Sequence, residues 1–119
     1  MFDHVTIRAS DRGASERFYT LLLRTLGIEP SRSGAHYAEW NDFSLAAADD
    51  EKPVTRGLHV AFGVADDATV DSFHRALTAA GYRDNGAPGE RAVYHPGYYG
   101  AFVRDPDGNN VELVNHNRG

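Results

Sequence analysis

The feature that most constrains the fold is an internal duplication. The pattern that surrounds residue 4 returns around residue 59, a shift of 55 positions. The coinciding pairs are His4 with His59, Val5 with Val60, Ile7 with Phe62, Asp11 with Asp66, Phe18 with Phe73 and Leu22 with Leu77. A chain that repeats its own pattern in this way is expected to fold as two similar units.

Each half begins as a strand followed by a helix. Apolar and polar residues alternate in Phe2–Arg8 and in Leu58–Val64, which is typical of a strand with one buried face. Apolar residues then recur at helical spacing. The residues that can cap and end these helices also coincide: Ser10 or Asp11 and Gly27 in the first half, Asp66 or Asp67 and Gly81 in the second.

Further strands are expected after each helix. Turn residues join two strand-like runs in each half: Tyr37–Trp40 and Phe43–Ala47, then Tyr98–Arg104 and Asn110–Val114. The second half also has a turn-rich insert, Asn85–Gly97, in which we predict a short strand at Ala92–Tyr94. We therefore predict one domain over residues 1–119, with a first module at 1–48, a linker at 49–56 and a second module at 57–119.

Composition excludes several classes of function. The net charge of −5 and the scattered basic residues argue against nucleic acid as a partner. No apolar run is long enough for a membrane helix, and no secretion signal is visible, so we expect a cytoplasmic protein without a membrane partner. The absence of cysteine leaves imidazole and oxygen as the available metal ligands.

Two histidines and one glutamate form a candidate metal site. Because side chains alternate across a strand, His4, His59 and Glu112 each face away from the apolar residues beside them. Two imidazoles and one carboxylate are a common ligand set for a divalent ion that keeps open positions for water or substrate. The sequence therefore predicts a divalent metal site at these three residues.

Strand pairing places further side chains near the predicted metal in the second half. If the turn at 105–109 closes a hairpin, Phe102 lies opposite Glu112 and Tyr98 lies opposite His116. We expect Phe102 and His116 to contact an organic substrate. Tyr98 is a candidate for proton transfer, with His95 and His116 as alternatives.

The first half supplies the remaining candidates. A two-residue turn at 41–42 sets Glu39 opposite Ser44, from which Glu39 can reach the cavity as a base. Thr6 shares the strand face of His4. We expect Thr6 and Ser44 to bind substrate, while metal-bound water is a further alternative for proton transfer.

The closing stretch from Tyr94 to Glu112, YHPGYYGAFVRDPDGNNVE, resembles the glyoxalase/bleomycin-resistance/extradiol-dioxygenase superfamily, also called vicinal oxygen chelate proteins. The openings of the two halves, FDHV at 2–5 and GLHVAF at 57–62, are similar to the starts of that family's modules. The resemblance covers essentially the whole chain. It implies an α+β fold of two βαβββ modules, forming a curved mixed sheet around a metal and substrate cavity with the helices outside. It also implies metal ligands at His4, His59 and Glu112.

The resemblance further implies a function. We expect a glyoxalase-like metalloenzyme of lyase or isomerase type, which uses Fe, Mn, Ni or Zn to chelate vicinal oxygens of a small organic substrate. Glyoxalase I carries a fourth ligand, a glutamate, where this chain has Ser44, and this departure weakens that particular assignment. An extradiol-type ring-cleaving dioxygenase and a non-catalytic small-molecule or antibiotic-binding resistance protein remain alternatives. The family favours a homodimer, and the cavity can close within one chain or across two.

Overall fold

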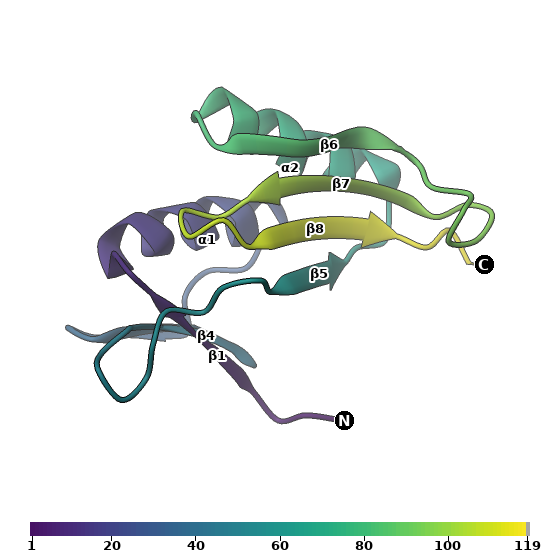
Figure 1. Cartoon of the computed structure of the whole chain (residues 1–119). Coiled ribbons are helices and arrows are strands. Elements are labelled where there is room, and N and C mark those ends of the chain that lie inside the picture. Colours follow the sequence, from purple (N-terminus) through teal and green to yellow (C-terminus); the bar gives the residue numbers. More distant parts are fainter. Residues whose placement is uncertain (119) are drawn as a thin grey trace.

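The computed structural model describes residues 1–118 and contains two four-stranded sheets, each accompanied by one helix (Figure 1). The first module consists of β1 (Val5–Ala9), α1 (Arg12–Thr25), β2 (Arg32–Ser33), β3 (Tyr37–Trp40) and β4 (Phe43–Ala47). The second consists of β5 (His59–Gly63), α2 (Asp67–Ala79), β6 (Arg83–Glu90), β7 (Tyr99–Arg104) and β8 (Asn110–Asn115). The strand orders β1-β4-β3-β2 and β5-β8-β7-β6 are equivalent, which confirms the two βαβββ modules.

The helices begin and end where local chemistry predicts. The carboxylates of Asp11 and Asp66 each accept a hydrogen bond from the backbone N–H three residues on, at 3.0 and 2.7 Å. Gly27 and Gly81 follow the two helices with φ of 76° and 95°, a conformation that glycine adopts without strain. Within residues 1–118, no helix has the length and apolar character needed to cross a membrane.

Both predicted hairpin registers are confirmed. Glu39 pairs with Ser44 across β3 and β4, and Phe102 pairs with Glu112 across β7 and β8. Asn41, in the two-residue turn between β3 and β4, has a φ of 55°, as such tight hairpin turns require. The first strand of each sheet pairs in parallel with the last, so β1 lies beside β4 and β5 beside β8.

One core serves both modules. The helices α1 and α2 contact each other, and buried side chains from both helices and both sheets form a single cluster. The rings of Phe43 in β4 and Phe62 in β5 are 5.5 Å apart within it. Because both sheets cover this shared core, their opposite faces point outward, and the two sheets do not close around a cavity within one chain.

The predicted strand at Ala92–Tyr94 is wrong. These residues lie in a turn, and the strand of this region is β6, Arg83–Glu90. Its Gly86, Pro88 and Gly89 are typical of turns, but β6 lies at the edge of its sheet, where proline and irregular pairing are tolerated. The alternation of apolar and polar residues also did not predict the two-residue strand β2.

Candidate functional site

A buried carboxylate marks the candidate site on β8. The side chain of Glu112 is only 1% exposed, and its Oε1 lies 2.7 Å from Nε2 of His59 on β5. Its Oε2 accepts a hydrogen bond from the hydroxyl of Tyr98. Among residues 1–118, no lysine or arginine forms an ion pair with Glu112. A buried carboxylate held without a permanent cation is well suited to receive one.

Small neighbours make room for this group. Glu112 pairs with Ala61 across the parallel strands β5 and β8, so its cross-strand neighbour on β5 carries only a methyl group. A Cβ atom on Gly100 would lie 3.1 Å from Oε2 of Glu112 and 3.3 Å from the ring of Tyr98. The contact between Tyr98 and Glu112 therefore depends on glycine at position 100.

Tyr98 acts as a hydrogen-bond donor in this arrangement. Its pKa is raised above the ordinary tyrosine value, first by burial and then by the hydrogen bond to Glu112 and the charge of Glu112. The phenol therefore stays protonated at neutral pH. Its hydroxyl donates to the carboxylate of Glu112 and so orients it.

Two further histidines lie against Tyr98. Nε2 of His95 is 2.9 Å from Nδ1 of His116, and the two rings stack with centroids 5.2 Å apart. Both rings also contact Tyr98 edge to face, at 5.4 and 5.3 Å. For this hydrogen bond one of the two nitrogens carries the proton and the other accepts it. His116, predicted to bind substrate, thus lies beside the second-module half of the site.

Phe102 forms the wall that its strand position predicts. It is 8% exposed, and its ring centroid lies 6.2 Å from that of His59. The guanidinium of Arg91 lies over the same ring, 5.4 Å from its centroid. Arg91 was not among the predicted site residues. The glycines at 86 and 89 that accommodate it are present in the sequence, but the turn-like composition concealed the strand on which they lie.

The first-module candidates lie on the other sheet. The hydroxyls of Thr6 and Ser44 form a hydrogen bond at 2.6 Å on an exposed face, and the half-buried Glu39 pairs with Ser44. The side chain of His4 is 68% exposed, with Nδ1 2.8 Å from a carboxylate oxygen of Asp3. The structure therefore divides the predicted residues into two groups, one on each sheet.

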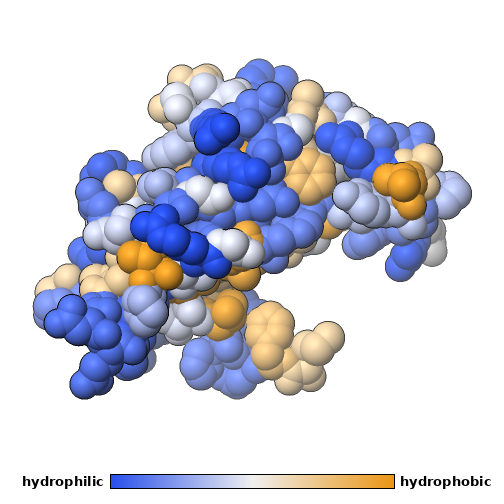
Figure 2. Space-filling model, in the orientation of Figure 1, coloured by the Kyte–Doolittle hydropathy of each residue, from blue (hydrophilic) through white to orange (hydrophobic). Residues whose placement is uncertain are grey.

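A groove between the two sheets holds both duplicated histidines. It has a volume of about 330 Å³ and is lined by Phe2, His4, Val5, Ile7, Phe43, Leu58, His59 and Val60. Figure 2 shows the hollow between the N-terminal segment, at the lower right, and the second sheet above it, with hydrophobic atoms on its walls. Val5 and Ile7 alternate with polar residues along β1, so both are expected on its core face. Val5 remains 37% exposed, because it begins the edge strand β1 at this groove.

The three predicted metal ligands do not gather in one chain. Within residues 1–118, no three His, Cys, Asp or Glu side chains lie close enough together to hold a metal ion. His59 and Glu112 form a pair of the right chemical types, and their 2.7 Å separation is close to the roughly 3 Å expected for adjacent ligands of one ion. His4, the third predicted ligand, does not join this pair within one chain.

Comparisons with known proteins agree with this architecture. The chain is 30% identical to the uncharacterized protein YqjT of Bacillus subtilis (strain 168), over 93% of this chain and 95% of that protein. A glyoxalase/bleomycin resistance protein from Albidiferax ferrireducens T118 is 30% identical, with a TM-score of 0.83 over 97% of this chain and 98% of that one. A lactoylglutathione lyase from Agrobacterium tumefaciens shares the fold, with 21% identity and a TM-score of 0.70 over 97% and 92% of the two chains.

The family is shown by a match over nearly the whole chain. The sequence profile of the Glyoxalase/Bleomycin resistance protein/Dioxygenase superfamily matches residues 1–113, which include the first module, most of the second and all three predicted metal ligands. This chain belongs to the Glyoxalase/Bleomycin resistance protein/Dioxygenase superfamily.

Proposed function

We propose that this protein is a glyoxalase-like metalloenzyme of lyase or isomerase type, which binds a divalent ion and a small substrate with two neighbouring oxygens. The observation that supports this most strongly is the buried carboxylate of Glu112, with Nε2 of His59 2.7 Å from one oxygen and Tyr98 donating to the other. The buried carboxylate and an imidazole that remains 55% exposed form a site to which a metal and a ligand have access.

The third ligand in this proposal is His4 of a second copy of the chain. Both sheets share one core, so the ligand faces of a single chain point outward and each lacks a facing half. The exposed side chains of His4 and Phe2 lie at the edge strand β1, where a second copy can cover them. A symmetric homodimer would then contain two equivalent sites, each built from one half of either copy.

The chain's own residues support this chemistry in defined ways. The bound ion would act as a Lewis acid that stabilises negative charge developing on the substrate oxygens. Tyr98 keeps the carboxylate of Glu112 oriented, while Phe102 provides an apolar wall beside it. Glu39 belongs to the same half as His4 and would enter the site with it as a candidate base for proton transfer.

A subunit-mixing experiment tests this assignment. Purified His4→Ala and His59→Ala variants should each bind no stoichiometric zinc. In a dimer that shares its sites, mixing the two variants yields heterodimers in which one site contains both substitutions and the other contains none. After random exchange of subunits, about a quarter of all sites should therefore recover zinc. Metal content measured after desalting, together with the molar mass in solution, provides the readout.

The other outcomes separate the alternatives. Full zinc binding by both variants would refute the three-ligand site. Loss of zinc without recovery on mixing would place all three ligands in one chain and overturn the shared site. Nickel, manganese and ferrous iron are tested in the same way, because ring cleavage with oxygen needs a redox-active ion whereas lyase or isomerase chemistry does not.

A further inference from the structure

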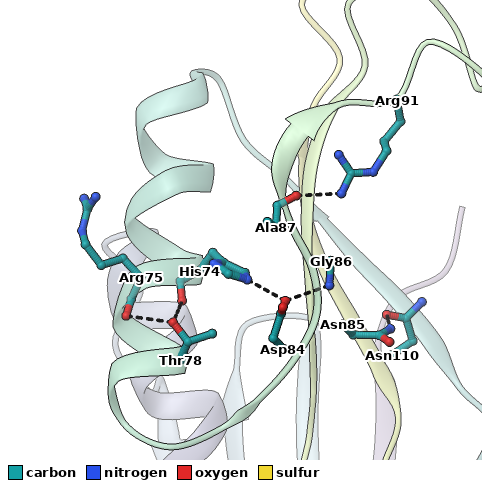
Figure 3. A network of polar contacts seen from close by, with 9 residues as sticks. All are labelled: His74, Arg75, Thr78, Asp84, Asn85, Gly86, Ala87, Arg91 and Asn110. Atoms are coloured by element: carbon teal, nitrogen blue, oxygen red, sulfur yellow. Dashed lines mark hydrogen bonds and ion pairs between the residues drawn. The ribbon is translucent and has the colours of Figure 1, made fainter.

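Arg91 places a cation beside the candidate site. Its guanidinium lies over the ring of Phe102. Its Nη2 donates a hydrogen bond to the carbonyl of Ala87 at 2.7 Å (Figure 3). Among residues 1–118, no Asp or Glu forms an ion pair with it. Since a guanidinium has five N–H donors, most of its hydrogen-bonding capacity remains available.

Two glycines create the space that Arg91 occupies. A Cβ atom on Gly86 would lie 2.9 Å from the ring of Phe102 and 3.3 Å from Nη2 of Arg91. A Cβ atom on Gly89 would lie 3.0 Å from Nη1 of Arg91. Any side chain at these positions would displace the guanidinium or the ring. The space that the guanidinium occupies therefore depends on the bare backbone of β6 at these two glycines.

The shape of β6 at this point is fixed from α2. Nε2 of His74 lies 2.8 Å from Oδ1 of Asp84, and the same oxygen accepts from the backbone N–H of Gly86 at 2.9 Å (Figure 3). These two hydrogen bonds, that of His74 first, lower the pKa of Asp84, so the carboxylate stays ionised. The pairing of β6 with β7 is irregular between Asp84 and Gly86, and this network holds the irregular segment in place.

Arg91 and the candidate metal ligands lie around the same ring. Gly86 pairs with Phe102, and Phe102 pairs with Glu112, so these positions form one row across three strands. The His59 ring also lies beside Phe102. A ligand bound beside Phe102 would thus meet the metal ligands and a fixed cation together.

We propose that Arg91 binds a carboxylate group of the substrate, so that the substrate class is a small organic acid with a carboxylate beyond its two chelating oxygens. This inference rests on the proposed function. The planar guanidinium matches a carboxylate through paired hydrogen bonds, and its stacking on Phe102 orders it before the ligand arrives. A neutral substrate would leave this half-buried cation without a counter-charge.

The test compares two probes that share the same chelating oxygens. Catechol has two neighbouring oxygens, and 3,4-dihydroxybenzoate adds a carboxylate to the same ring. We expect the zinc-loaded protein to bind 3,4-dihydroxybenzoate about 10- to 100-fold more tightly than catechol by calorimetry at fixed ionic strength. Arg91→Gln should abolish this preference while leaving the affinity for catechol unchanged. Arg75→Gln, which removes an exposed arginine from α2, is the matched control and should keep the preference.

Each result decides between distinct readings. Equal affinities of the wild-type protein for the two probes, or a preference that survives in Arg91→Gln, would overturn the carboxylate inference and leave the proposed function standing, provided that catechol binding requires zinc and His59. Failure of both probes to bind would reject the proposed function and the inference with it. Unchanged catechol binding by Arg91→Gln also reports that the variant keeps an intact site.

Discussion

The two sheets share a strand order but carry different residues at equivalent positions. Thr6 pairs with Ser44 in the first sheet, and the corresponding pair in the second is Ala61 and Glu112. In the first sheet the two hydroxyls satisfy each other on an exposed face. In the second, alanine leaves room for a buried carboxylate that needs other partners. The comparison teaches that the two modules share one backbone architecture, whereas the residue at one equivalent position, Ser44 or Glu112, determines which sheet contains the carboxylate.

The largest expected effect comes from breaking a buried polar contact between the two halves. The buried Asp105 accepts a hydrogen bond from the hydroxyl of Tyr19 at 2.7 Å and another from the backbone N–H of Asn109 at 2.9 Å. Asp105→Ala leaves these buried donors unpaired, so we expect the free energy of unfolding to fall by about 3 kcal/mol. Urea unfolding measures this change, and Asp50→Ala in the exposed linker is the control. A loss below about 1 kcal/mol would show that the halves hold together without this contact.

Exchanging the acid in only one sheet sharpens the comparison further. Glu112→Gln should weaken zinc binding at least about 100-fold, because it removes a charged ligand from a buried position. Ser44→Ala changes the equivalent residue of the first sheet and should leave zinc affinity unchanged. Competition with a chromophoric chelator measures both affinities. An equal loss in the two variants would indicate that the sheets contribute equally, contrary to the proposed site.

The stability of the protein at alkaline pH reports on the contact between Tyr19 and Asp105. The pKa of Tyr19 is raised, mainly by burial and then by the charge of Asp105. The unfolded chain releases this proton near pH 10, whereas the folded chain retains it. Stability is therefore complete below about pH 10 and falls above it, by about 1.4 kcal/mol per pH unit for one such tyrosine.

Tyr19→Phe should make the free energy of unfolding fall less steeply with rising pH, by the contribution of one tyrosine, whatever the substitution does to stability at pH 8. Urea unfolding at a series of pH values from 8 to about 11 provides the measurement. Identical slopes for the variant and the wild-type protein would mean that Tyr19 ionises as readily in the folded state as in the unfolded state.

The smallest effect is expected on the exposed face of the first sheet. Thr6→Val removes the hydrogen bond to Ser44, but the Ser44 hydroxyl can then bond to water, so the free energy of unfolding should change by no more than about 0.5 kcal/mol. Thermal unfolding at neutral pH is sufficient to measure this. A destabilisation comparable to that of Asp105→Ala would remove the contrast between an exposed pair and a buried one.

Local rules were sufficient for much of the fold. The caps at Asp11 and Asp66 follow from side-chain chemistry within one turn. The hairpin registers follow from turn length, so the sequence alone is sufficient to place Phe102 opposite Glu112. Alternation also placed His59 correctly on the face opposite the half-buried apolar residues of β5.

The remainder depends on contacts between distant segments. The burial of Glu112 requires Tyr98 to cover it, and no periodic pattern encodes the direction of that ring. The two glycines that leave space for Arg91 lie on β6, a strand whose composition resembles a turn. Alternation identified the outward face of each sheet, but it does not specify how two modules meet. For this reason the sequence predicted three ligands around one ion, whereas within residues 1–118 of one chain no three such side chains lie close enough together to hold a metal ion.

The loop between β7 and β8 gives the two halves unequal roles. Asn109 is bonded to Asp105 within this loop, and its side chain also bonds to Leu58 and Thr55. Strand β8 starts at the next residue, Asn110. The position of Glu112 in the fold is therefore linked to helix α1 of the opposite half through the hydrogen bond between Tyr19 and Asp105. Two copies of the second module joined to each other would keep the strand order but would lack the tyrosine of α1 that bonds to this loop.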